Sequence, residues 1–443
     1  MYSVSKSFRG GIHPGDHKSA TASKAIEVMP VPSKLIIPLR QHIGAPCEPT
    51  VAKGDLVKKG QIIADIGAFV SSPIHASTSG KVLDIIESPH PVFGKCMSII
   101  LESDGQDEWI SGISGTPNWE SLSNEELGKC IRSAGIVGMG GATFPTHIKL
   151  NPPKDKALDS FILNAAECEP FLTADHRLML EYPQEIVTGV LIAMKMLGVP
   201  NGYIGVEDNK PDAIEAMKKA FAGVPGVQVV ALPTKYPQGG EKMLIKAILN
   251  REVPSGALPV DAGAVVQNVG TVIAIADAVI KGLPMVERVV TISGGSVVNP
   301  KNVMVRIGTT FSDVVDFCGG FNEIPEKIIM GGPMMGFAQS SLDVPVIKGV
   351  SGILGLSKSD VNSGKEGPCI RCGRCVDACP MSLVPSMLSI LGQKGFWQDA
   401  KEEYNLMDCI ECGSCVYVCP AKRNIVQYVR YCKALNAANP PKK

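Results

Sequence analysis

The sequence lacks an excess of either charge, a long apolar run and an export signal. Its 443 residues contain 43 Lys and Arg and 43 Asp and Glu, so the formal net charge is zero. A nucleic-acid-binding protein usually has a basic excess, so this balance argues against nucleic acid as a partner. No uncharged apolar segment reaches the roughly 18 residues of a membrane-spanning helix. The N-terminal segment MYSVSKSFRGG has no apolar core of a signal peptide. We therefore expect a soluble protein, or one peripheral to a membrane.

Cysteine, by contrast, is abundant, with 14 residues. In a chain without an export signal, metal ligation explains such a number better than disulfides do. Eight of the cysteines lie in two C-terminal blocks, CIRCGRCVDACP at 369–380 and CIECGSCVYVCP at 409–420. Each block has the spacing CxxCxxCxxxCP, which is typical of bacterial proteins with two [4Fe–4S] clusters.

In this pattern the first three cysteines of a block ligate one cluster and the fourth ligates the other. We therefore expect two ligand sets: Cys369, Cys372, Cys375 and Cys419 for one cluster, and Cys409, Cys412, Cys415 and Cys379 for the other. The alternative is a pair of zinc sites, which commonly use two CxxC pairs. Two complete four-cysteine blocks, each closed by Pro, favour iron and sulfide. Two adjacent clusters transfer single electrons, so the chain before them is expected to supply another redox centre or docking surfaces.

The first 110 residues are rich in Gly, Pro and short β-like runs. The turn VAKGDLVKKGQ, followed by SPIHASTSGKV, resembles the barrel–sandwich hybrid fold of lipoyl and biotinyl domains. Those domains modify a lysine at a hairpin tip, and the segment from Ile66 to Ser79 contains none. We expect a structural β-domain, with His75 in an exposed loop.

Residues 120–285 alternate between strand-like and helix-like segments, which favours a parallel sheet with helices on its faces. SFILNAA, GYIGVE and VQVVAL are the expected strands, and DHRLMLEYPQEIVTGVLIAMKMLG, KPDAIEAMKKAF and GGEKMLIKAILN the expected helices. We expect a small α+β unit at 286–345 and a connecting arm at 341–365. We expect a ferredoxin-like module, with a helical linker between its cysteine blocks, at 366–432. The tail NAANPPKK is expected to be disordered. The fold class is therefore multidomain α/β and α+β.

A glycine-rich loop, IVGMGGATFPTHIK at 136–149, suggests a nucleotide site. The dinucleotide motif GxGxxG must follow a strand and open a helix. Here Gly138 and Gly140 fit, with Gly141 beside them, but Thr143 occupies the third glycine position and the loop follows a helix-like segment. A standard dinucleotide loop is therefore excluded, and a tight turn without a ligand is the alternative.

Three further segments begin where strands are predicted to end, which is where open α/β sheets bind ligands. NAAECEP, KYPQGGEK and VVQNVGT combine small residues with amide and carboxylate groups that could surround a flavin. The alternative is that they are ordinary loops, with Glu167 or Glu241 capping a helix. The candidate residues are Asn164, Glu167, Glu169, Tyr236, Gly239, Gly240, Glu241, Gln267, Asn268 and Thr271.

In this order, the glycine loop and the three segments resemble the FMN and NADH site of the flavoprotein subunit of respiratory NADH dehydrogenase. The wider order of domains resembles the RnfC family, whose members belong to Rnf complexes, the membrane-bound ferredoxin–NAD⁺ oxidoreductases. The resemblance covers nearly the whole chain. It implies a barrel–sandwich hybrid at 1–110, a Rossmann-like FMN/NADH domain at 120–285, a β-grasp-like (SLBB-like) unit at 286–345 and a helical two-cluster module at 366–432.

The resemblance also implies residue roles. The backbone of the loop, Gly138, Gly140, Gly141, Ala142 and Thr143, would hold FMN, and Phe144 would lie near the NADH adenine. Lys149, Asn164, Gln267 and Asn268 would hydrogen-bond the flavin, and Glu169 and Glu241 would contact the nicotinamide nucleotide. One departure is Ala166, which stands where the NADH dehydrogenase motif has an aspartate.

The implied function is electron transfer between NAD(H), FMN and two [4Fe–4S] clusters in an ion-translocating complex. The chain would lie on the cytoplasmic face of the cell membrane, peripherally, bound to membrane and iron–sulfur subunits, with ferredoxin an indirect partner. One alternative is an NADH-dependent cobalamin (corrin) reductase of a propanediol-utilisation microcompartment. Another is a non-enzymatic iron–sulfur relay.

Overall fold

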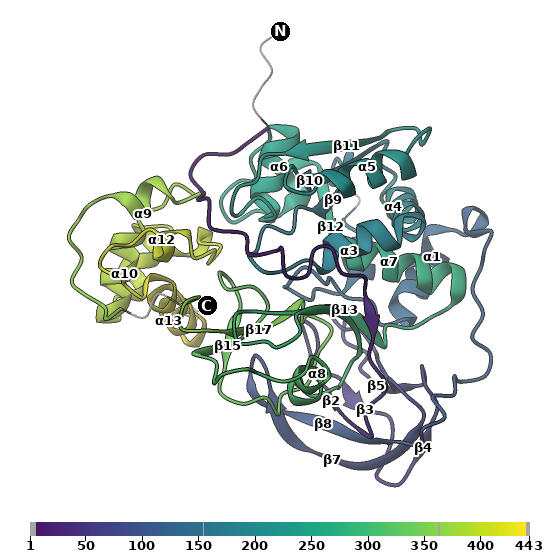
Figure 1. Ribbon diagram of the computed structural model, residues 1–443. Helices are drawn as coiled ribbons and strands as arrows, with labels where there is room; N and C mark the ends of the chain where they lie inside the picture. The colour runs from purple at the N-terminus through teal and green to yellow at the C-terminus, as the bar shows by residue number, and fades with distance from the viewer. Residues whose placement is uncertain (1–5, 154, 362–363, 440–443) are drawn as a thin grey trace.

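A computed structural model describes residues 6–153, 155–361 and 364–439 of the chain. It contains two small β-sheets, a parallel sheet covered by helices, a six-stranded mixed sheet and a separate helical module (Figure 1). The expectation of a multidomain chain of mixed α and β structure is confirmed. None of the helices in these described ranges is long and apolar enough to cross a membrane.

The N-terminal β part pairs a four-stranded sheet, in the order β2-β8-β7-β4, with a three-stranded sheet, β3-β5-β6. Side chains of β2 (KLIIP) point alternately to the two faces of the sheet, as in any strand. Lys34 is exposed, while Leu35 and Ile37 are fully buried and pair with Leu101 and Ile99 of β8. The strands are β2 (Lys34–Pro38), β3 (Glu48–Pro49), β4 (Leu56–Val57), β5 (Ile62–Asp65), β6 (Ile74–His75), β7 (Gly80–His90) and β8 (Gly94–Ser103).

The prediction that His75 lies in an exposed loop is wrong. His75 ends β6, which pairs with β5, and its side chain is buried. Burial and the positive charge of Lys348 lower the pKa of His75 to about 3, so its ring is neutral at physiological pH. The segment folds inward because it packs against residues that come much later in the chain, which a local sequence pattern does not reveal.

The second part is built on a parallel sheet in the order β11-β10-β9-β12, as the alternating sequence predicted. The elements are α1 (Asn124–Ser133), α2 (Thr146–Lys149), β9 (Ser160–Ala165), α3 (Ala174–Glu181), α4 (Pro183–Leu197), β10 (Asn201–Glu207), α5 (Pro211–Ala220), β11 (Val227–Leu232), α6 (Glu241–Leu249), β12 (Ala264–Asn268) and α7 (Val269–Ala276). The segment predicted as one helix over DHRLMLEYPQEIVTGVLIAMKMLG is two helices. Pro183 opens α4, where its missing N–H leaves no hydrogen bond unmade.

Strand β9 is buried on both faces, which explains its continuous apolar sequence. Phe161 and Leu163 point into one hydrophobic core, shared with α4 and α7. Ile162 points into another, together with Val230 of β11 and Leu244 of α6. The carboxyl end of β9 is therefore a rigid position from which the loop after it can be placed.

The third part is a mixed sheet in the order β1-β14-β13-β17-β15-β16. Its elements are β13 (Glu287–Ser293), β14 (Lys301–Arg306), α8 (Phe311–Phe317), β15 (Lys327–Met330), β16 (Phe337–Gln339), β17 (Gly352–Leu356) and β1 (Glu27–Val28). Residues 341–365 are not merely a connecting arm, because β17 within them pairs with both β13 and β15. Two strands of this sheet, β1 and β17, therefore lie outside residues 286–345.

The fourth part holds the cysteine blocks and has two similar halves. Each half has a short helix within its block and a longer helix after it: α9 (Arg374–Asp377) and α10 (Pro385–Lys394), then α12 (Ser414–Tyr417) and α13 (Ile425–Ala438), with α11 (Trp397–Glu402) between them. Leu388, Leu391, Val429 and Cys432 form the core between the longer helices. The predicted disorder of NAANPPKK is wrong for its first residues, since α13 continues to Ala438. Residues 440–443 lie outside the described ranges.

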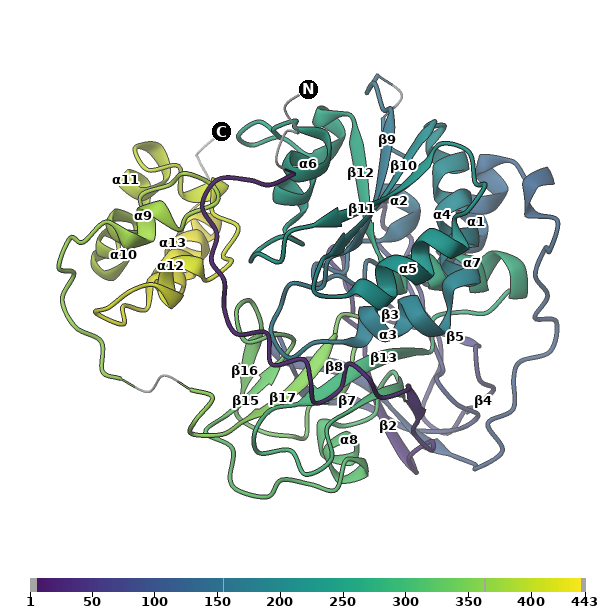
Figure 2. The same ribbon diagram turned by 45° about the horizontal axis from the view of Figure 1, so that its top comes forward.

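An N-terminal arm, residues 6–28, runs along the other parts (Figures 1 and 2). Gly11 donates a hydrogen bond to the carbonyl of Ala378 in the helical module, and Ile12 exchanges two backbone hydrogen bonds with Tyr236 beside the parallel sheet. The arm then ends as β1 on the mixed sheet. It thus connects three parts that are far apart in sequence.

A buried lysine, Lys348, connects the mixed sheet to the N-terminal β part and to the helical layer of the parallel sheet. The ammonium of Lys348, which precedes β17, donates to the carbonyls of Pro73 in the N-terminal β part (2.9 Å) and Gly135 after α1 (2.5 Å). The side chain is almost completely buried, and this burial lowers the pKa of Lys348 to about 8, from a usual value of 10.5.

Lys348 should make stability depend on pH in the alkaline range. Between pH 8 and 10.5 the unfolded chain binds a proton that the folded chain does not, so stability rises with pH through this window. Lys348→Met removes the titration. We expect the free energy of unfolding of the wild type, relative to that of K348M, to increase from pH 8 to pH 10 by on the order of 2 kcal/mol. Urea unfolding at several pH values measures it, and parallel pH profiles for the two proteins would contradict this account.

Candidate functional site

The carboxyl ends of the parallel strands bring three of the predicted segments together. Asn164 of β9 and Asn268 of β12 are partners in register. The Asn164 amide donates to the carbonyl of Gly239, in the loop between β11 and α6, at 2.8 Å. NAAECEP, KYPQGGEK and VVQNVGT therefore meet at one edge of the sheet, as expected from strand order.

The glycine loop closes the same edge. Gly138 donates to the carbonyl of Phe144, and Met139 donates to the hydroxyl of Thr271 on α7 at 2.9 Å. Gly140 lies against Asn268, where an added Cβ would come within 3.3 Å of that side chain. Gly141 has φ +121°, which favours glycine, and no described atom lies within 4 Å of its Cβ position. The loop thus presents exposed backbone at Gly140, Gly141 and Ala142.

A charged pair stands beside this loop. Lys149, the last residue of α2, contacts Glu241, the first residue of α6, with 2.7 Å between Nζ and Oε1. Both side chains are partly exposed. Glu241 begins α6 and Lys149 ends α2, and their partial exposure leaves both charges accessible to a polar ligand.

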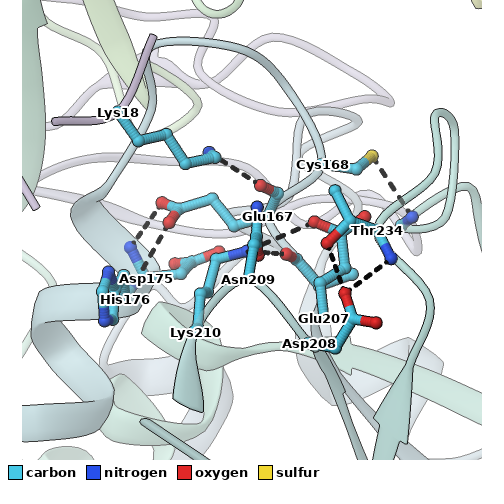
Figure 3. Close-up of polar contacts among 12 residues, drawn as sticks. Lys18, Glu167, Cys168, Asp175, His176, Glu207, Asp208, Asn209, Lys210 and Thr234 are labelled. Atoms are coloured by element: carbon cyan, nitrogen blue, oxygen red, sulfur yellow. Dashed lines mark hydrogen bonds and ion pairs between the residues drawn. The ribbon is translucent and has the colours of Figure 1, made fainter. Parts of the chain in front are cut away.

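Two of the predicted ligand-contacting residues, Glu167 and Asn268, also support the local fold. The Glu167 carboxylate accepts hydrogen bonds from the backbone N–H groups of Asp175 (2.7 Å) and His176 (3.1 Å) at the start of α3, as Figure 3 shows. It is therefore a helix cap, the alternative role considered from the sequence. Asn268 accepts from Gly270 N–H and donates to Asp175, so both ends of its amide are engaged. Burial and the charge of Glu167 raise the pKa of Asp175 to about 7.

Two buried lysines hold the loop after β9, and the sequence patterns did not single them out. The ammonium of Lys210 donates to Ala166 O (2.7 Å), Asn209 Oδ1 (2.8 Å) and the Glu207 carboxylate (3.2 Å) (Figure 3). Lys18 of the N-terminal arm donates to the carbonyls of Glu167, Glu169 and Leu172. The position of Lys210 just after β10 was a usable clue. Lys18 offers none, because it lies about 150 residues from the loop it contacts.

Some buried amides at this edge have unused hydrogen-bonding atoms. Gln267 of β12 is buried, and its Nε2 has no partner among the described residues. Gln238, in the loop before α6, is also buried, and both of its amide atoms lack a described partner. Unpaired buried polar atoms are costly, so a bound ligand or water that satisfies them fits this edge.

Glu169 and Tyr236 face the cysteine module. The Glu169 carboxylate accepts from the backbone N–H groups of Met334 (3.0 Å) and Met335 (2.9 Å), and from the Tyr236 hydroxyl at 3.3 Å. That hydroxyl also contacts the carbonyl of Cys412 at 2.7 Å. Burial raises the pKa of Glu169 to about 7. The two side chains thus join the sheet edge to the second cysteine block.

The eight cysteines line two separate hollows, grouped as the sequence predicted. One is lined by Cys379, Cys409, Cys412 and Cys415. The other is lined by Cys369, Cys372, Cys375 and Cys419. In each hollow the fourth cysteine of one block joins the first three of the other. In the described part of the chain, no three Cys, His, Asp or Glu side chains converge as ligands of a single metal ion would. The cysteines therefore surround a space, which suits a cluster better than zinc.

The first hollow lies against the sheet edge. Ile12, Tyr236, Ala378 and Cys412 form one buried cluster, with Cys168 packed against it. Gly10 and Gly11 have φ +70° and +80°, and a Cβ on them would come within 2.6 Å of the Cys379 carbonyl oxygen and 2.7 Å of the Tyr236 carbonyl oxygen. Only glycine allows the arm to pass between the two parts at this distance.

Family models match the chain in the order of its structural parts. The RnfC barrel sandwich hybrid domain matches residues 6–106, the Nuo51 FMN-binding domain 131–277, the SLBB domain 289–338 and the 4Fe-4S dicluster domain 363–420. The C subunit of the proton-translocating ferredoxin:NAD(+) oxidoreductase complex of Clostridium ljungdahlii is 67% identical over 98% of this chain and 94% of its own length. The chain belongs to the RnfC family.

A second relative agrees with this assignment, and a solved structure shares the fold. The C subunit of the Na(+)-translocating complex of Acetobacterium woodii is 50% identical to this RnfC chain over 96% of both chains. An NAD⁺-reducing [NiFe]-hydrogenase structure shares the fold over 72% of this chain and 68% of its own, with a TM-score of 0.52 and 16% identity. Full-length identity to RnfC proteins favours this family over the corrin reductase considered from the sequence.

The buried ion pair of Lys210 and Glu207 can be tested for its contribution to stability at the edge of the parallel sheet. Lys210→Met leaves the Glu207 carboxylate buried without its cation, so we expect it to lower the free energy of unfolding by about 3 kcal/mol. Adding Glu207→Gln should recover part of this loss. In the matched control Lys246→Met, the partner Glu252 is exposed, and a loss below about 1 kcal/mol is expected. Equal losses in K210M and K246M, by urea unfolding, would contradict the importance of the buried pair.

Proposed function

We propose that this RnfC-family chain exchanges electrons between NAD(H) and its own cofactors within a membrane-bound ferredoxin:NAD⁺ oxidoreductase complex. The observation that carries the proposal is the direct contact between the flavin-type sheet edge and the first hollow, through Tyr236 and Cys412. The relatives are named as parts of such complexes, which supports other subunits as partners and ferredoxin as an indirect one. Their names differ in the translocated ion, so no ion is assigned.

FMN bound at the sheet edge would supply the conversion between two-electron and one-electron chemistry. We assign its binding to the loop from Gly138 to Thr143, whose backbone at Gly140, Gly141 and Ala142 is exposed and could be approached by a phosphate or a ring. Lys149, Asn164 and Gln267 would donate hydrogen bonds to it. The Nε2 atom of Gln267 has no hydrogen-bond partner in the described part of the chain, which supports its assignment. The remaining predicted residues support or border the site: Phe144, Tyr236, Gly239, Gly240, Asn268 and Thr271.

Ala166 stands where the related flavoprotein motif has an aspartate, and its environment suggests what replaces that group. Its carbonyl accepts a hydrogen bond from Lys210, and Lys18 holds the next residues of the loop. We propose that these two lysines hold the backbone of the loop in place through their hydrogen bonds to its carbonyls.

The two glutamates assigned to the nicotinamide nucleotide differ in their surroundings. Both oxygens of Glu169 are engaged with Met334, Met335 and Tyr236. Glu241 contacts only Lys149 among its described charged neighbours and remains partly exposed. We therefore assign nucleotide contact to Glu241, and assign Glu169 to the junction with the cysteine module.

Each cysteine hollow would hold one [4Fe–4S] cluster, with thiolates as ligands and single-electron transfer as the chemistry supplied. Cys379, Cys409, Cys412 and Cys415 would hold the cluster nearer the sheet edge. Cys369, Cys372, Cys375 and Cys419 would hold the farther one. The match to a dicluster family supports both assignments.

Finer points of architecture and location belong to the same proposal. The sheet of β9 to β12 would serve as a Rossmann-like FMN/NADH domain near 120–285, and the mixed sheet as a β-grasp-like unit. The domains near 1–110 and 366–432 would flank them. We place the chain on the cytoplasmic face of the cell membrane, held by membrane subunits, because NAD(H) and ferredoxin are cytoplasmic.

The proposal is tested by reconstituting the chain with FMN, iron and sulfide under anaerobic conditions. NADH should bleach the flavin and cluster absorbance and support turnover with an artificial acceptor. Absence of FMN binding and of NADH-dependent bleaching would overturn the enzymatic proposal and leave an iron–sulfur relay.

Glu241→Gln should reduce NADH turnover about tenfold, since it removes a charge at the proposed nucleotide contact. The cluster spectrum and iron content should stay unchanged, because Glu241 is outside both hollows. Glu252→Gln, which removes an exposed carboxylate just beyond the same helix, is the control and should retain turnover. Loss of the clusters in E241Q would show that the sheet edge and the module are not separable.

A further inference from the structure

The two cysteine blocks are structural repeats. Each cysteine of the first block recurs 40 positions later (369 and 409, 379 and 419). The backbones agree even at unusual angles: φ is +54° at Arg371 and +57° at Glu411, and +79° at Gly373 and +78° at Gly413. The surface that one block presents therefore has a geometric equivalent on the other.

The second block uses this surface to dock within the chain. Cys412, Gly413 and Ser414 are buried, and a Cβ on Gly413 would come within 2.9 Å of the Met334 carbonyl oxygen. Ile410 packs with Tyr236 and Ile12. This surface, Ile410 to Ser414, is how the first hollow meets the sheet edge.

The equivalent surface of the first block, Ile370 to Arg374, is open. All five residues are exposed, and Ile370 has 64% of its surface accessible. No described atom lies within 4 Å of a Cβ placed on Gly373. Cys372, which lines the second hollow, is itself exposed here. Within the described residues, the chain thus repeats a docking surface: the copy in the second block is covered, and the copy in the first block is not.

Charge distinguishes the two copies. Glu411 of the covered surface is neutralised by Arg430 and Lys433 within the module. The open surface has Arg371 at that position and Arg374 where the covered one has Ser414. Neither arginine forms an ion pair with a described residue, and the one acid in the block, Asp377, lies at the end of α9. Two unpaired arginines around an exposed apolar residue favour an acidic partner.

We propose that the surface Ile370–Arg374 is the docking site for a second iron–sulfur protein domain with an acidic surface around its own cluster. The inference rests on the proposed function, which makes the adjacent hollow a redox centre. In one direction, an electron that comes from NADH leaves the cluster held by Cys369, Cys372, Cys375 and Cys419. That cluster is oxidised and the partner's cluster is reduced. In the opposite direction, the partner's cluster supplies the electron.

Binding tests the surface without any need for turnover. The cluster-loaded, oxidised chain is titrated with an acidic two-cluster ferredoxin as probe, at several salt concentrations. The double variant Arg371→Gln/Arg374→Gln should weaken ferredoxin binding about tenfold at low salt. Its binding should also depend less on salt, because the arginine charges that salt would screen (Debye length about 10 Å at 0.1 M) are gone. Lys218→Gln with Lys219→Gln, on exposed residues of α5, removes the same charge elsewhere and should change binding less than about twofold.

Basic cytochrome c serves as the second probe, and its binding should not weaken in the double arginine variant. Equal losses in the two double variants would show an effect of net charge and overturn the site. Unchanged ferredoxin binding in R371Q/R374Q would also overturn it. Failure of the proposed NADH chemistry would instead appear as absent NADH-dependent bleaching, while these binding results stand independently.

Discussion

The second cysteine block packs directly against the edge of the parallel sheet, and the N-terminal arm is threaded through this contact. Tyr236 reaches the Cys412 carbonyl, and Gly10 and Gly11 let the N-terminal arm pass between the two surfaces. An electron can move between a flavin-type site and a cluster only if the two are held close together. The contacts of the N-terminal arm and of Tyr236 hold the sheet edge and the second cysteine block together.

The sheet edge is held by buried charge as well as by apolar packing. Lys210 and Lys18 donate hydrogen bonds to backbone carbonyls of the loop after β9, and Lys348 donates to carbonyls where three parts meet. Burying a cation is costly unless it is paired or hydrogen-bonded, so these lysines are stable only when their surroundings are complete. The same residues that order the site therefore couple its formation to the assembly of the whole chain.

Patterns that act over short distances were predictable from the sequence. The cysteine spacing predicted which cysteines share a hollow, and alternating segments predicted the parallel sheet and the edge where its loops meet. Features that depend on distant partners were not predictable. β17 was missed because its sheet partners lie elsewhere in the chain, and His75 was misplaced because later residues bury it. Lys18 was missed for the same reason, while the individual contacts of FMN and NADH remain predictions.

The contact between Gly11 and Tyr236 should set the rate of electron transfer between the sheet edge and the nearer cluster. Gly11→Ala would bring a Cβ within 2.7 Å of the Tyr236 carbonyl oxygen, whereas Gly54→Ala, also at positive φ (+97°), meets no described atom within 4 Å. Rapid mixing of the loaded proteins with NADH follows flavin and cluster absorbance separately. G11A should keep the wild-type rate of flavin bleaching and slow cluster bleaching at least tenfold, while G54A should change neither rate. Cluster bleaching at the wild-type rate in folded G11A would show that this contact does not control electron transfer.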